Sequence, residues 1–162
     1  FQEQLLYSLH QQSESEGQIR LAWGNIVLPI SFRIDPFAQF KDKVFREAAQ
    51  RDSTTQWVVY VQGAEYLANQ GQELDVALEW LKLSEQLATK ANPWNEQFYP
   101  KHYILGHIYW TRAKVYAQLG AYTQAVNWAQ VLFEMRQNYN YYDKKGESER
   151  INELVERWRE RL

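Results

Sequence analysis

AKVYAQLGAYTQAVNW, residues 113–128, has a close relative earlier in the chain, AEYLANQGQELDVALEW at residues 64–80. In both stretches two Ala are followed by a Gly, then by an Ala and a Trp at matching spacing, with one extra residue after the first Gly. Gly is the usual residue just after a helix, and small side chains let two helices approach closely. Each copy therefore predicts a helix–turn–helix. Because such a hairpin cannot bury its apolar face alone, we expect it to stack on the next copy.

The second copy resembles the tetratricopeptide repeat, whose hallmark is a small residue followed by Tyr, Gly, Tyr and Ala at fixed spacing. The matching positions are Ala113, Tyr116, Gly120, Tyr122 and Ala125. The first copy is similar, through Ala64, Leu67, Gly71, Leu74 and Ala77. The two glycines are farther apart than the roughly 34 residues of the family repeat. The resemblance implies an α-solenoid that binds proteins or peptides on its concave side, mainly through the first helix of each pair.

The N-terminal part of the chain has the pattern of strands. Apolar and polar residues alternate in QIRLAWGN, residues 18–25, and in IVLPISFRID, residues 26–35. This period of two is typical of half-buried strands, and Gly24-Asn25 between them favours a hairpin turn. QLLYSLHQ, residues 4–11, can supply a third strand. The sequence predicts an antiparallel hairpin or a small three-stranded sheet over residues 1–35.

At Asp35-Pro36 the period changes to that of helices, since Asp is a good N-cap and Pro suits the first helical position. A helix of about 14 residues is expected from Pro36, and Ser53 with Gln56 forms a potential capping box for the next. The later helices are expected at about 54–70, 74–90, 101–119, 123–138 and 147–162. We therefore expect a mainly α protein, a solenoid of about six helices over residues 36–162, behind the small N-terminal sheet.

A second resemblance covers residues 17–162. It rests on GQIRLAWGNIVLPISFRID at 17–35, YLANQGQELDVALEWL at 66–81 and AKVYAQLGAYTQAV at 113–126. In this order they are similar to the C-terminal part of an uncharacterised bacterial family called domain of unknown function 2911. The resemblance implies that residues 1–35 are the remnant of a β domain that precedes helical repeats. It also implies an exported protein of the periplasm or cell envelope, with no established catalytic residues.

Composition and charge restrict the function. The net charge is −2 and the pI about 6.0, which argues against nucleic acid as the main partner. No apolar run reaches the roughly 18 residues of a membrane span, and without Cys there is no disulfide. His10, His102 and His107 lack the spacing of a metal site on one helix face. No phosphate loop or nucleophile motif is present. We expect a non-catalytic protein with no cofactor.

Two binding sites are hypothesised. On the first helices of the two pairs, repeat position selects Glu65, Asn69, His107, Trp110, Lys114 and Gln118 as a groove for a protein or peptide. The simpler interpretation is that these are ordinary solvated polar residues. The second hypothesis is a small-molecule or glycan site built from loop aromatics, namely Trp94, Tyr99, Tyr139 and Tyr141. The apolar strands need cover as well, either from the helix that starts at Pro36 or from strand pairing in a homodimer.

Overall fold

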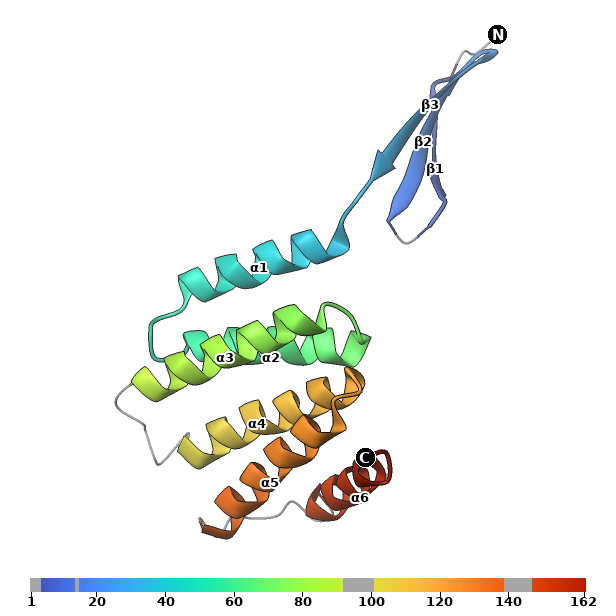
Figure 1. Cartoon of the computed structure of the whole chain (residues 1–162). Helices are drawn as coiled ribbons and strands as arrows, with labels where there is room; N and C mark the ends of the chain where they lie inside the picture. The colour runs from blue at the N-terminus through green and yellow to red at the C-terminus, as the bar shows by residue number, and fades with distance from the viewer. Residues whose placement is uncertain (1–3, 14, 92–100, 139–146) are drawn as a thin grey trace. The chain divides into compact units, whose positions relative to one another are not determined.

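The structure, a computed structural model, describes residues 4–13, 15–91, 101–138 and 147–162, and the chain is mainly helical (Figure 1). Its elements are β1 (Leu6–Gln11), β2 (Glu16–Trp23), β3 (Ile26–Arg33), α1 (Pro36–Gln50), α2 (Gln56–Gln70), α3 (Leu74–Lys90), α4 (Lys101–Gln118), α5 (Tyr122–Asn138) and α6 (Glu147–Arg159). The six expected helices are confirmed, with ends that differ from the expected ones by at most three residues. The chain divides into two compact units, residues 1–43 and 44–162.

The first unit contains a three-stranded antiparallel sheet in the order β1-β2-β3, which confirms the larger of the two predicted forms. Leu21 of β2 lies opposite Tyr7 of β1 and Leu28 of β3. Residues directly opposite each other in such a sheet share a face. Most apolar side chains of the three strands therefore lie on the same side of the sheet, whereas Leu6, Ala22 and Val27 lie on the other.

Gly17 and Phe32 show why a glycine lies inside β2. The two residues are register partners, and the ring of Phe32 covers the glycine backbone. A Cβ at position 17 would lie 2.9 Å from Cε1 of Phe32 and closer still to Cζ, so any larger residue would displace the ring. The pair resembles the use of an aromatic ring to shield a strand glycine from solvent.

Local sequence sets these helix ends, although one predicted cap is wrong. Oδ1 of Asp35 accepts hydrogen bonds from the backbone N–H of Phe37 and Ala38 at 3.0 and 2.9 Å, so it caps α1 as expected. The capping box of Ser53 is wrong, because α2 begins after Thr55 without a side-chain cap. Oδ1 of Asp52 instead accepts from the backbone N–H of Thr54 at 2.9 Å. The carboxylate one residue earlier organises this turn and moves the start of α2 to Gln56.

Gly71 and Gly120 end the first helix of each pair in the same way. Both are left-handed, with φ of 65° and 73°. The N–H of Gly71 donates to Ala68, and the N–H of the next residue donates to Leu67, the two bonds of a Schellman motif. Gly120 ends α4 with the equivalent bonds. The extra residue of the first copy is accommodated at Glu73, which has a φ of 51° just before α3.

In the second unit α2 packs against α3 and α4 against α5, and the two pairs are stacked (Figure 1). α4 contacts both α2 and α3, while α6 packs on α5. Small residues lie where the helices cross, since Ala77 and Ala125 are fully buried. Gly63 serves the same purpose, because a Cβ there would lie 2.8 Å from Cζ3 of Trp80. These small residues allow the close helix approach that the repeat pattern predicts.

A partly buried ion pair joins the two helix pairs. Nη2 of Arg112 in α4 lies 2.8 Å from Oε2 of Glu85 in α3, and its guanidinium lies 4.3 Å from the centroid of the Trp128 ring in α5. The hydroxyl of Tyr109 donates to Oε1 of the same carboxylate at 3.0 Å. Burial and the neighbouring Glu85 carboxylate raise the pKa of Tyr109 to about 12, so this hydroxyl remains a donor near neutral pH. The cluster fixes how α3, α4 and α5 meet.

Candidate functional site

A pocket of about 320 Å³ lies among α2, α4, α5 and α6 in the second unit. One helix supplies half of its lining residues. α4 presents Tyr103, Gly106, His107, Trp110 and Lys114, which recur at spacings of three and four residues and therefore occupy one helix face. The pocket is thus built mainly on the first helix of the second pair, completed by its neighbours.

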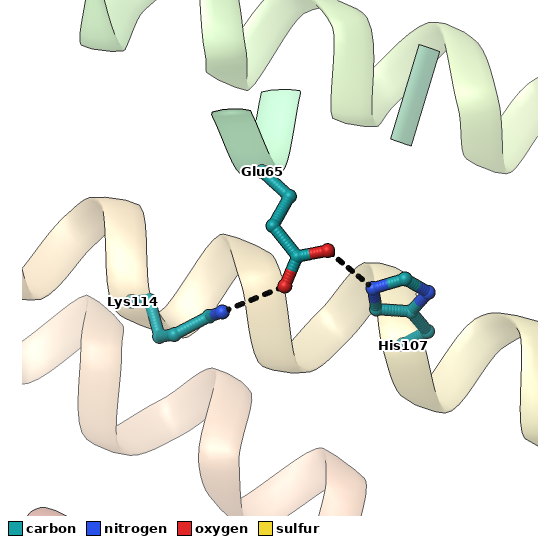
Figure 2. Close-up of polar contacts among 3 residues, drawn as sticks. All are labelled: Glu65, His107 and Lys114. Carbon is teal, nitrogen blue, oxygen red and sulfur yellow. Dashed lines mark hydrogen bonds and ion pairs between the residues drawn. The ribbon is translucent and has the colours of Figure 1, made fainter. Parts of the chain in front are cut away.

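Glu65 of α2, one of the lining residues of this pocket, connects the two helix pairs through contacts with α4 (Figure 2). Its Oε1 accepts a hydrogen bond from Nζ of Lys114 at 3.0 Å. Its Oε2 accepts from Nε2 of His107 at 3.1 Å. Figure 2 shows both partners on α4, one on either side of the carboxylate. A single carboxylate therefore holds two side chains that are about two helical turns apart on α4.

The surroundings of Glu65 strongly favour its charged form. The hydrogen bond from His107, together with the hydrogen bond and positive charge of Lys114, lowers the pKa of the Glu65 carboxyl to about 2. Partial burial raises the pKa, but the His107 and Lys114 interactions together outweigh it. About a third of the side chain of Glu65 is exposed, so the network can be reached from solvent.

The apolar residues that line the pocket are packed against neighbouring helices. The ring of Trp110 is stacked on Trp158 of α6, with centroids 5.7 Å apart and an interplanar angle of 28°. Gly106 lets α5 approach closely, because a Cβ there would lie 3.3 Å from Cδ1 of Leu132 and 3.4 Å from Cε of Met135. Leu132 and Met135 therefore line the pocket together with Trp110.

A second ion pair, from α5 and α6, also lines the pocket. Nη2 of Arg136 in α5 lies 3.5 Å from Oε1 of Glu147 in α6, and Nη1 donates to the hydroxyl of Ser148 at 3.2 Å. Arg136 is mostly buried, whereas Glu147 is partly exposed. The lining of the pocket thus combines apolar residues with two ion-paired groups, each of which has one carboxylate and at least one basic side chain.

Four of the six predicted groove residues are brought together here: Glu65, His107, Trp110 and Lys114 all line the pocket. Asn69 and Gln118 are exposed near the C-terminal ends of α2 and α4 and are not among the lining residues. The alternative aromatic residues Trp94, Tyr99, Tyr139 and Tyr141 lie outside the described residues.

Sequence reasoning missed the lining residues from α5 and α6. Leu132, Met135, Arg136 and Glu147 belong to elements that were not assigned to the groove. A signal was available in part, because Arg136 and Glu147 are opposite charges that flank the connection between two helices. Nothing in the repeat pattern predicted that α5 and α6 would contribute lining residues to the pocket.

Within the described ranges, no group of three or more His, Cys, Asp or Glu side chains is arranged to hold a metal ion. The helices in the same ranges include none that is long and apolar enough to cross a membrane. None of the protein-family models, curated proteins or solved structures with which the chain was compared matches it. Function is therefore inferred from the geometry of the pocket.

Proposed function

We propose that this chain is a non-catalytic scaffold of the tetratricopeptide type that binds a peptide segment of another protein in the pocket. The observation that carries the proposal is that four groove residues chosen by repeat position line one pocket. The two Schellman glycines and the buried Ala77 and Ala125 at the helix crossings support the likeness to that repeat.

The chemistry of the lining indicates what kind of peptide fits. A volume of about 320 Å³ is at the small end of ligand pockets, so it accommodates one or two side chains. Trp110, Leu132 and Met135 provide an apolar surface for an aromatic or large aliphatic side chain. Glu65 and Lys114 of the same lining offer an acceptor and a donor for the backbone of an extended peptide. We therefore expect an extended segment anchored by one large apolar residue.

The resemblance to an exported bacterial family leads us to place this scaffold in the periplasm or cell envelope. Cell fractionation of the source organism, followed by immunoblotting, tests the location. Recovery in the cytoplasmic fraction alone would contradict it. The glycan or small-molecule hypothesis for Trp94, Tyr99, Tyr139 and Tyr141 stays a prediction, and the binding experiment below includes it as an outcome.

The binding experiment uses a random peptide library selected on the immobilised chain. Affinities of the selected peptides are then measured in solution by fluorescence polarisation. We expect micromolar dissociation constants, about −8 kcal/mol. Tyr103→Ala removes an exposed pocket ring, and we expect it to weaken binding roughly tenfold, a loss of about 1.4 kcal/mol.

Tyr66→Ala is the matched control. Tyr66 is exposed to a similar extent as Tyr103 but is not among the residues that line the pocket. We expect its affinity to stay within twofold of the parent. Peptides that bind both variants as tightly as the parent would contradict the pocket as the binding site. If no peptide binds saturably but an oligosaccharide does, the alternative site at Trp94, Tyr99, Tyr139 and Tyr141 would be favoured.

A further inference from the structure

One face of the N-terminal sheet is predominantly apolar. Besides Gly17 and Gln11 at one end, the register places nine large apolar residues on it, which we call the apolar sheet face: Tyr7, Leu9, Ile19, Leu21, Trp23, Ile26, Leu28, Ile30 and Phe32. The opposite face is largely polar, and its side chains interact with one another. Nε of Arg20 donates to Gln18 at 2.7 Å, and Arg33 pairs with Glu16 at 3.5 Å. The sheet is therefore strongly two-sided.

The apolar sheet face is exposed to a degree that is unusual for a folded protein. Tyr7, Leu9 and Ile26 are 69%, 71% and 69% exposed, and Leu28 is 54% exposed. A fully exposed aromatic side chain contributes on the order of 150–250 Å², and a Leu or Ile side chain contributes less. The half-exposed side chains of this face therefore amount to about 800 Å², more than the few hundred Å² of a typical monomer patch. A patch of this size is a surface for association.

We propose that a second copy of this chain covers the apolar sheet face, so that two sheets pack face to face. Two such faces would bury about 1,600 Å² in total, the size of a standard stable protein interface. None of the nine residues is charged, so nothing on this face selects a partner of complementary charge. Under two-fold symmetry an apolar face is its own complement, and paired sheets about 10 Å apart are an ordinary arrangement.

The sheet edges are less suited to association than the face. β3 is an edge strand, and Pro29 lies in its middle. Proline has no N–H to donate, so it interrupts the ladder that a further strand would need. β1, the other edge, offers only six residues. These features favour face-to-face packing over the addition of strands at an edge.

The first test measures the mass of the full chain by light scattering after size exclusion at micromolar concentration. We expect a dimer. Leu28→Lys places a charge on the apolar sheet face and should give a monomer. Ser31→Lys is the control, because Ser31 is an exposed residue of the same strand on the opposite face. It should remain a dimer. A monomeric parent, or a Leu28→Lys variant that stays dimeric, overturns the proposal.

A second test does not depend on a disruptive substitution. The chain has no Cys, so a single introduced Cys is the only thiol. Ile19 lies on the central strand within the apolar sheet face, and Arg20 beside it points to the other face. With a short bis-maleimide, Ile19→Cys should give a covalent dimer, and Arg20→Cys should not. Equal cross-linking of both variants contradicts face-to-face packing. A monomer that binds neutral phosphatidylcholine vesicles also overturns it, because the face would then cover lipid.

Discussion

Glu65 and Lys114 occupy equivalent positions in the two copies of the repeat, each directly after the first Ala of its copy, and their side chains meet at 3.0 Å. The same repeat position is thus occupied by an acidic residue in the first helix pair and by a basic residue in the second. Stacking of the pairs brings the two positions together, and His107 completes the contact at 3.1 Å. A repeat that stacks on itself can therefore connect its copies through opposite charges at one position.

We predict that Glu65→Gln lowers the free energy of unfolding by about 1 kcal/mol. The variant loses two charge-assisted hydrogen bonds, and their partial exposure to solvent keeps the loss modest. Urea unfolding followed by circular dichroism measures it. Glu47→Gln is the control, since Glu47 of α1 forms an exposed pair with Arg51 just after the helix, and the change should alter stability by less than about 0.5 kcal/mol. Equal effects of the two changes would contradict a structural role for the Glu65 network.

The acid sensitivity of the fold should depend on the same carboxylate. The pKa of Glu65 is lowered from its ordinary value of 4.5 to about 2. A lowered pKa stabilises the folded state above the unfolded value, and this contribution is lost as the pH falls from about 4.5 to 2. The stability of the parent should therefore fall more steeply across this interval than that of Glu65→Gln. Parallel pH profiles for the two proteins would show that Glu65 is not the carboxyl responsible.

The elements could be predicted because their signals are local. Asp35 before Pro36 and the glycines at 71 and 120 each act on residues within one turn, and all three are found as expected. Ser53 failed for a local reason as well, because Asp52 is a stronger competing acceptor one residue away. The alternation of apolar residues also predicted which residues of β2 and of β3 share a face.

The pocket could be predicted only in part. Glu65, His107, Trp110 and Lys114 were found because repeat position places them on the first helices. The remaining lining residues on α5 and α6 were missed, namely Leu132, Met135, Arg136 and Glu147. Their positions in the pocket depend on how α5 and α6 pack, and the repeat pattern does not predict that packing. Asn69 and Gln118 share a repeat position but lie toward the helix ends, so shared position alone did not place them in the pocket.

Ala125→Leu should destabilise the fold by roughly 1–3 kcal/mol, because Ala125 is fully buried where α5 meets its neighbours and a larger side chain would overpack this crossing. Thermal unfolding is the measurement. Ala49→Leu, an exposed position on α1, serves as the control and should leave the melting temperature nearly unchanged. A melting temperature of Ala125→Leu within a degree of the parent would mean that the helix pairing is wrong.

Thr111 and Ser84 provide a pair of opposite predictions, since both are fully buried hydroxyl residues. Ser84 donates to the carbonyl of Trp57 at 2.8 Å, so Ser84→Ala should cost about 1 kcal/mol. Oγ1 of Thr111 has no hydrogen-bond partner in the described part of the chain, so Thr111→Val, which keeps the shape, should be neutral or stabilising. Chemical denaturation of both variants tests this. If Thr111→Val lowers the free energy of unfolding as much as Ser84→Ala does, the conclusion that Oγ1 of Thr111 lacks a hydrogen-bond partner is wrong.

The most direct test of the peptide-binding pocket follows the indole N–H signals of the seven Trp residues by nuclear magnetic resonance. The signal of Trp110 is assigned by its loss in Trp110→Phe, and that of Trp94 in the same way. A peptide selected on the chain is then titrated in. The proposed function predicts that the Trp110 signal shifts in proportion to saturation, while the Trp94 signal stays in place. A saturable shift of Trp94 with Trp110 unchanged would contradict it and would assign binding to the aromatic loops.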